Sequence, residues 1–557
     1  MRCALPLVLV SLSMAVSAFA QAAEADFTAL RDAYVARFRP AYIELEEANW
    51  AANISGTDAD YARVRAASKA LIDLHSDHDV FAKLKALRAG GEVRDPVLAR
   101  ELEVMYLAFL PGQADPALAK RIADLEADLD QLFNTHRSQV GDKQLSENVV
   151  RAILATSTDS AAVEAAWKGY MEIGRKAEAK LHELVGLRNE LARQLGYDNF
   201  FSLQLAIQEI DEKELFKLFE ELDALTRGPF TQLKHDLDAV RAARFGVKPA
   251  ELRPWHFGDL FFQEVPRDDE MNLDTLFADA DLVALAKTYY ASIGLPVDDI
   301  LACSDLYEKP GKCPHAFCAD INRSGDVRIL CNMTRNVYWA DTILHELGHA
   351  VYDKYIGADV PFVVHMASHA LTTEGIAQMF GALAKNEEYL RQVIGVDAAK
   401  AAEVGAAARA ALRAERLIFS RWSQVMLHFE YGMYANPDQD LGKLWWDLKQ
   451  RYQMLNPPES TQRPDYAAKT HILSTPAYYH NYLMGELFAA QVRHKITADV
   501  LHRDDVGRSC FYRAPQVGDY LREQVFAPGS LYAWNELTRR ATGEPLTAKY
   551  YAAEVTE

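Results

Sequence analysis

The chain has 557 residues, of which 79 are acidic and 60 basic, so its formal net charge is −19. Its composition, with 50% hydrophobic and 25% charged residues, is that of a globular protein. The 28 glycines, 21 prolines and six cysteines exclude collagen-like, disordered and disulfide-scaffold chains. The negative charge argues against a nucleic-acid partner, because phosphates require a basic surface. This length exceeds what one core usually fills, so we expect two lobes with a groove between them.

The N-terminal residues are typical of a secretory signal peptide. Arg2 supplies a positive charge, residues 4–16 form an apolar run, and Ala18-Phe19-Ala20 gives a small-residue end. The alternative is an N-terminal membrane anchor, but the apolar run is short for a bilayer span. We therefore predict that residues 1–20 are cleaved and that the mature protein is secreted, most simply to a bacterial periplasm, without stable membrane insertion.

Helical patterning dominates the chain after this segment. Residues 27–244 carry apolar side chains at three- and four-residue spacing, which indicates amphipathic helices, and prolines end the region at Pro249, Pro254 and Pro266. From about residue 337 the helical pattern returns, with breaks near residues 357–361, 436–440 and 456–464. The expected fold class is all-α.

One short segment favours β-structure. In residues 315–331, two alternating runs flank Arg323-Ser324-Gly325-Asp326, which predicts a β-hairpin or edge strand. The same region holds four of the five cysteines that remain after cleavage. Their spacings lack the paired C-x2-C of a zinc ribbon, so we expect one or two local disulfides with open pairing, and Cys510 as the free thiol. The four clustered cysteines are Cys303, Cys313, Cys318 and Cys331.

The strongest local motif is His345-Glu346-Leu347-Gly348-His349. Residues four apart share one helix face, so His345 and His349 can direct their imidazole nitrogens to one metal ion. Glu346 lies about 100° round the helix, near enough to hold a metal-bound water. This spacing therefore predicts a zinc peptidase helix, provided that a third ligand exists.

Glu374 is the predicted third zinc ligand. It lies 25 residues after His349, at the start of a second helix that we expect Thr372 or Thr373 to cap. His365 and His369 are the competing candidates for this position. Two imidazoles and one carboxylate leave an open coordination position, which a catalytic zinc ion requires. We predict one Zn²⁺ per chain.

Further motifs follow in order along the chain: Glu47-Ala48-Asn49-Trp50, Glu308-Lys309-Pro310, His315-Ala316, Trp445-Trp446, Pro457-Pro458, Lys469-Thr470-His471 and Tyr479-His480-Asn481-Tyr482. Together with the HELGH helix, they resemble the angiotensin-converting enzyme family of zinc peptidyl-dipeptidases, which are gluzincin metallopeptidases. The resemblance covers most of the mature chain and would make this chain a bacterial secreted member. It implies a single peptidase unit over residues 21–557, with two helical lobes forming an ellipsoid around a deep central cleft and a small β element beside the zinc.

The resemblance also implies roles for individual residues. Glu346 would be the general base, with His471 and Tyr482 as donors to the oxyanion. His315 and Ala316 would pair with the substrate backbone. The substrate's C-terminal carboxylate would be held by Gln263, Lys469 and Tyr479.

Three departures limit this transfer. Family members often bind activating chloride through two arginines, whereas this chain has Lys449 and Asn481 there, which argues against chloride dependence. Gln378 stands where the family has an aspartate that orients a ligating histidine; its amide oxygen can still accept that bond. The interval from His471 to Tyr482 is one residue longer than usual, so Tyr478 is an alternative to Tyr479.

The predicted function is removal of C-terminal dipeptides from oligopeptides with a free C-terminus, by Glu-assisted attack of a zinc-bound water. One alternative is an internally cutting zinc oligopeptidase similar to the thimet oligopeptidase family. Another is a peptide-binding or receptor protein that holds zinc without activity. The sequence leaves the physiological substrate, the side-chain preference and the oligomeric state open.

Overall fold

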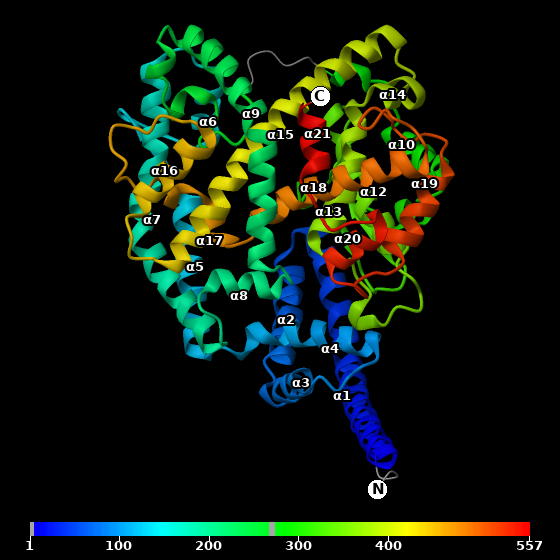
Figure 1. Cartoon of the computed structure of the whole chain (residues 1–557). Coiled ribbons are helices and arrows are strands. Elements are labelled where there is room, and N and C mark those ends of the chain that lie inside the picture. The colour runs from blue at the N-terminus through cyan, green and yellow to red at the C-terminus, as the bar shows by residue number, and fades with distance from the viewer. Residues whose placement is uncertain (1–4, 267–272, 557) are drawn as a thin grey trace. The chain divides into compact units, whose positions relative to one another are not determined.

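The computed structural model describes residues 5–266 and 273–556 (Figure 1). Among these residues, helices predominate and the β-structure consists of two small antiparallel pairs of strands, which confirms the predicted all-α fold. None of the helices in the described ranges is long and apolar enough to cross a membrane. Helix α1 covers Leu5–Ser55, and cleavage near Ala20 stays a prediction.

The chain divides into two compact units, each assembled from three separate segments. Unit 1 comprises Met1–Gln113, Leu276–Ala384 and Phe511–Pro545, and unit 2 comprises Ala114–Thr275, Lys385–Cys510 and Leu546–Glu557. The predicted cleft between two lobes of one peptidase unit stays a prediction.

Unit 1 contains the zinc helix and a β-hairpin. Its main elements are α1, α2 (Asp58–His75), α3 (His78–Gly90), α4 (Pro96–Phe109), α10 (Leu282–Ser292), α11 (Asp298–Cys303), β3 (Phe317–Asp320), β4 (Val327–Leu330), α12 (Val337–Lys354), α13 (Ala370–Gly381), α19 (Pro515–Tyr520) and α20 (Trp534–Thr542).

Unit 2 is built around two long helices, α7 (Ser160–Gln194) and α15 (Ala398–Ala435). Its other main elements are α5 (Pro116–Thr135), β1 (Ser138–Val140), β2 (Lys143–Leu145), α6 (Glu147–Thr156), α8 (Phe200–Ile207), α9 (Glu212–Phe245), α14 (Glu387–Tyr389), α16 (Leu441–Gln453), α17 (Thr470–Ser474), α18 (His480–Lys495) and α21 (Lys549–Thr556). The β1–β2 hairpin lies inside a region predicted to be helical. Its turn contains Gly141 at φ +61°, a conformation that favours glycine.

The predicted hairpin forms at the expected place, with β3 antiparallel to β4. Side chains shape its turn: Asp320 Oδ1 accepts from the Arg323 amide at 2.8 Å, and Asn322 Oδ1 accepts from the Ser324 amide at 3.0 Å. Arg323 and Gly325 both have positive φ. Within the described part of the sheet, β3 pairs with β4 alone, whereas β4 also bridges to Asp305 on its other side. The hairpin therefore presents β3 as an edge strand.

The helix pair α12 and α13 brings the zinc motif together, and the two helices pack closely along their length (Figure 1). Asn336 caps α12 by accepting from the Trp339 amide at 2.9 Å. Gly348 permits the close approach, because a Cβ there would lie 2.7 Å from Ala377 Cα on α13. One turn further along α13, a Cβ on Gly381 would lie 2.6 Å from Asp341 Oδ1. The two glycines thus let the helix axes come near enough for one carboxylate to reach two imidazoles.

Candidate active site

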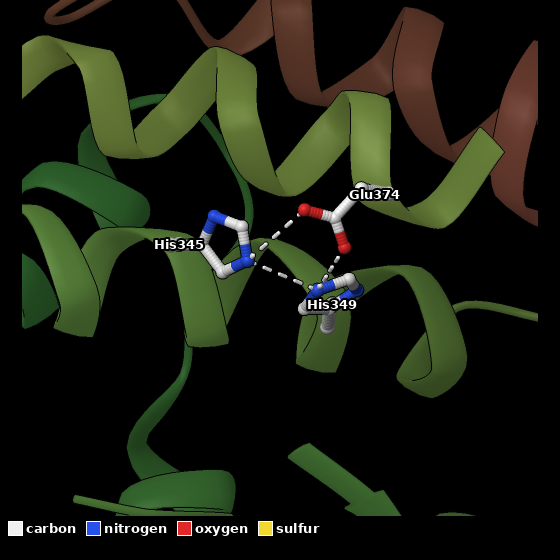
Figure 2. A group of neighbouring side chains, drawn as sticks. All are labelled: His345, His349 and Glu374. Atoms are coloured by element: carbon white, nitrogen blue, oxygen red, sulfur yellow. Dashed lines mark hydrogen bonds and ion pairs between the residues drawn. The ribbon is translucent and has the colours of Figure 1, made fainter. Parts of the chain in front are cut away.

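The three predicted zinc ligands converge in unit 1. His345 and His349 project from α12 and Glu374 from α13, and their ring nitrogens and carboxylate oxygens face one another (Figure 2). The two Nε2 atoms are 3.2 Å apart, and Glu374 lies 3.7 Å from His345 Nε2 and 3.5 Å from His349 Nε2. Of the described histidine, cysteine, aspartate and glutamate residues, only these three gather with a metal-binding geometry.

This donor set fits a zinc ion. Tetrahedral Zn²⁺ with bonds of about 2.0–2.1 Å holds its ligand atoms roughly 3.3 Å apart, close to the separations of 3.2 to 3.7 Å found here. Burial lowers the pKa of His345 to about 4, so its imidazole is neutral and keeps a free lone pair. Burial alone would raise the pKa of Glu374, but the two histidines outweigh it and hold that pKa below its usual value. The site therefore offers a neutral imidazole and an ionised carboxylate.

The residues behind the ligands differ from the sequence prediction. Thr373 Oγ1 lies 2.7 Å from His349 Nδ1, so this hydroxyl fixes the orientation of the ring, a role that the sequence did not indicate. Gln378 donates from Nε2 to Glu374 Oε1 at 3.3 Å, and its own Oε1 has no hydrogen-bond partner among the described residues. Gln378 therefore supports the carboxylate ligand, and its oxygen does not accept the bond from a histidine that the sequence left possible.

The start of α13 also differs from the expectation. The helix begins at Ala370, and His369 caps it by accepting from the Leu371 amide at Nδ1, 3.0 Å away. Thr372 and Thr373 lie inside the first turn and are not the cap, because the helix starts one turn earlier than predicted. His369 is thus engaged at a helix end, and the buried His365 lies outside the metal-binding group.

Glu346 lies next to the first zinc ligand, on the buried part of α12. Burial raises the pKa of its carboxyl to about 7, against the opposing effect of the nearby His349. A carboxyl with a pKa near neutrality can both accept and release a proton at physiological pH. This is the property that a general base needs if it is also to act as the acid later in the reaction.

The predicted backbone-pairing residues, His315 and Ala316, come directly before β3 in unit 1. They therefore lie at the start of the edge strand. The cysteines around them do not form the predicted disulfides in this structure. None of the five described cysteines is in a disulfide, so Cys510 is no exception; the five are Cys303, Cys313, Cys318, Cys331 and Cys510. Cys318 instead faces Asp353 of α12, with Sγ 4.0 Å from Oδ2.

The predicted carboxylate-binding residues gather in unit 2. Lys469 Nζ donates to Gln263 Oε1 at 2.8 Å, although the two residues are far apart in sequence. Its ammonium group lies 5.5 Å from the Tyr479 ring centroid and close to the rings of Phe261 and Trp422. Burial lowers the pKa of Lys469 to about 8. Tyr479 is the buried tyrosine of the pair, whereas Tyr478 is half-buried and packs on Tyr482.

The two predicted oxyanion donors also lie in unit 2. His471 is on α17 and Tyr482 is in the first turn of α18, with ring centroids 6.3 Å apart. The Tyr479 ring contacts both, at 5.2 Å from His471 and 5.3 Å from Tyr482. Burial lowers the pKa of His471 to about 4, so its ring is neutral. His471 can therefore act as an uncharged donor.

Comparison with known proteins places these residues in a family. The profile of the family described as "Angiotensin-converting enzyme" matches residues 21–234 and 264–550. Similar proteins include the angiotensin-converting enzyme of Sus scrofa, 22% identical over 94% of this chain and 42% of that protein, and that of Rattus norvegicus, 23% identical over 70% and 32%. The chain thus spans about a third to two fifths of the length of these relatives. It belongs to the angiotensin-converting enzyme family.

Proposed function

We propose that this protein is a zinc-dependent peptidyl-dipeptidase, which removes dipeptides from the free C-terminus of oligopeptides. The observation that carries the proposal is the convergence of His345, His349 and Glu374 at zinc-binding distances. Family membership supports it, since the relatives bear the name angiotensin-converting enzyme over a shared segment of chain. His345, His349 and Glu374 would hold one Zn²⁺ per chain.

Zinc supplies Lewis acidity when bound, polarising the scissile carbonyl and lowering the pKa of a water ligand. Glu346 would act as the general base: its carboxylate oxygen takes a proton from the attacking water and passes it to the nitrogen of the leaving amine. Its pKa of about 7 suits both transfers. His471 and Tyr482 would donate hydrogen bonds to the oxygen on which negative charge develops. Neutral, preorganised donors are the most effective groups for that purpose.

Substrate selection would depend on the chain end. Lys469, Gln263 and Tyr479 would bind the terminal carboxylate through a charge-assisted hydrogen bond and two neutral contacts. Their separation from the zinc ligands would set how many residues are released. His315 and Ala316 would pair with the peptide backbone at the β3 edge, a mode that is tolerant of side chains. The partners implied are short peptides with a free C-terminus.

Mass spectrometry of the products from a synthetic octapeptide tests the proposal. Successive loss of two C-terminal residues, abolished by a chelator and restored by zinc, is the expected result. Internal cleavage that ignores C-terminal amidation would instead favour an oligopeptidase of the thimet type. Zinc binding with no cleavage of any peptide would favour the inactive, peptide-binding alternative.

We also propose that the protein is exported and that residues 1–20 are removed on the way. The charge, apolar run and small-residue end of this segment support the proposal. N-terminal sequencing of the protein recovered from the periplasm of an expression host tests it. A sequence starting near Gln21 is expected, and intact residues 1–20 on the recovered protein would contradict it.

A further inference from the structure

The carboxylate anchor depends on a tight turn formed by residues 259–263. Asp259 Oδ2 accepts from the amide of Phe261 at 3.2 Å and from the amide of Gln263 at 2.8 Å. Phe262 has φ +53°, in the left-handed region that bulky side chains rarely adopt. Such a backbone conformation is strained and persists only where the surroundings enforce it. The turn that presents Gln263 is therefore under strain.

Two residues of α16 hold the other side of this turn. Lys449 Nζ donates to the Phe261 carbonyl at 2.8 Å, and Gln453 Nε2 donates to the Phe262 carbonyl at 2.6 Å. Lys449 and Gln453 are one helical turn apart, so both donors lie on the same face of α16. Each side chain is buried, with 2% and 0% exposure respectively. The strained residue is thus bracketed by two donors on consecutive carbonyls.

We propose that Lys449 and Gln453 are positioning residues for the carboxylate anchor, which hold the 259–263 turn in the conformation that keeps Gln263 Oε1 against Lys469 Nζ. This inference rests on the proposed function, because it assumes that Gln263 and Lys469 bind the terminal carboxylate of the substrate. Lys449 and Gln453 act through the backbone that carries Gln263.

The surroundings of the two lysines support this role. Lys449 Nζ lies 5.0 Å and Lys469 Nζ 5.3 Å from the centroid of the Trp422 ring, so both ammonium groups share one indole. Asp259 raises the pKa of each lysine, against a larger lowering by burial. Burying two amino groups beside each other is costly whether or not both carry a charge. If position 449 needed only to fill space, an apolar residue would do so at a lower cost. A donor to the Phe261 carbonyl is what lysine adds there.

A purely structural role for Lys449 makes a different prediction from a positioning role. If Lys449 served only to stabilise the fold, Lys449→Met would lower the melting temperature and depress turnover of every peptide alike. If it positions Gln263, the variant loses affinity only for peptides whose terminal carboxylate uses the anchor. A free-acid peptide and its C-terminal amide therefore separate the two roles.

The experiment compares Lys449→Met, Lys449→Arg and Gln453→Met with the wild type on this peptide pair. For Lys449→Met and Gln453→Met we expect KM for the free acid to rise about tenfold, the effect of weakening one charge-assisted contact, with kcat nearly unchanged and the amide unaffected. Arginine keeps a cationic donor at this position, so Lys449→Arg should have a KM for the free acid close to that of the wild type. Lys443→Met is the matched control, since Lys443 is an exposed lysine on the same helix that pairs with Asp447.

The inference would be overturned if KM for the free acid and KM for the amide rose equally in Lys449→Met. It would also be overturned if this variant had the same KM for the free acid as the wild type. If the wild type has the same KM for the free-acid peptide and its amide, the proposed carboxylate anchor itself is refuted. A crystal structure of Lys449→Met then decides the positioning claim independently of turnover. Gln263 Oε1 should move out of hydrogen-bond distance of Lys469 Nζ, whereas retention of the 2.8 Å contact would contradict the claim.

Discussion

The proposed zinc ligands of unit 1 and the proposed carboxylate anchor of unit 2 are built by opposite means. His345, His349 and Glu374 come from two adjacent helices whose regular backbone already aims them at one point. Lys469 and Gln263 come from irregular segments far apart in the sequence, and the left-handed Phe262 next to Gln263 must be held in place. The metal site needs close helix packing, whereas the anchor needs buried donors that restrain a turn.

Glu346→Gln should give the largest effect. The amide cannot take a proton from water, so we expect kcat to fall about 10³-fold while zinc content, measured by mass spectrometry, is unchanged. Glu403→Gln is the control, because Glu403 is an exposed glutamate on α15. If Glu346→Gln kept the wild-type kcat, Glu346 could not be the general base.

Lys469→Met tests the anchor at its centre. Without the ammonium group the substrate carboxylate has no charged partner, so KM for a free-acid peptide should rise about 100-fold. The corresponding amide should show almost no change, since it never used the charge. Steady-state kinetics with both peptides measure this, and an equal loss on both would mean that Lys469 serves the fold instead.

Gly348→Ala tests how strictly the metal site depends on helix spacing. The added methyl would meet Ala377 Cα at 2.7 Å, and separating α12 from α13 should cost about 1–3 kcal/mol. We expect a lower melting temperature and weaker zinc binding together. Gly186→Ala on α7 is the matched control, because nothing lies within 4 Å of the Cβ position there.

Thr373→Val removes the hydroxyl that holds His349 Nδ1 but keeps the shape of the side chain. Outer partners of this kind usually contribute 10- to 100-fold to metal affinity, and for a neutral hydroxyl we expect about tenfold. Competition with a fluorescent chelator measures it. Thr342→Val is the control, because the hydroxyl of this half-buried threonine on α12 donates to the Tyr338 carbonyl. It should leave zinc affinity unchanged, and an equal loss of zinc affinity in this variant would contradict the role of Thr373.

The pH dependence of KM should show the smallest effect. Lys469 binds a carboxylate only when protonated, and its pKa of about 8 lies far below that of a free lysine because of burial. The carboxylates of Asp259, Glu264 and Glu147 raise this pKa and offset the burial only in part, whereas the positive charges of Arg151 and Lys449 lower it further. Lys469 is therefore mostly charged below pH 8 and loses its charge above it. For the free acid, KM at pH 8.5 should be about fourfold higher than at low pH, whereas KM for the amide should not change.

What the sequence could predict follows the same division. The HELGH helix, Glu374 and the β3–β4 turn were predictable because short-range spacing and turn residues determine them. The contact of Gln378 with Glu374 and the cap at His369 were not, because the first depends on side-chain rotamers and the second on where the loop after α12 meets α13. The β1–β2 hairpin was missed because its strands are very short.

The anchor shows the limit most clearly. Lys469 and Gln263 could be named only through a resemblance, since neither residue type nor spacing marks a lysine as buried. The sequence gives no sign that Phe262 is left-handed or that Lys449 reaches the Phe261 carbonyl. These features arise from the packing of α16 against a distant turn, and no local pattern encodes them.

The indole shared by the two lysines gives this protein a built-in optical reporter. Trp422 is fully buried and lies within about 5.3 Å of both ammonium groups, so a change in either charge alters the field across its ring. The difference between the emission spectra of the wild type and Trp422→Phe isolates this one fluorophore among the eight tryptophans. Ligand arrival at the anchor can then be followed in real time, without a label and without turnover.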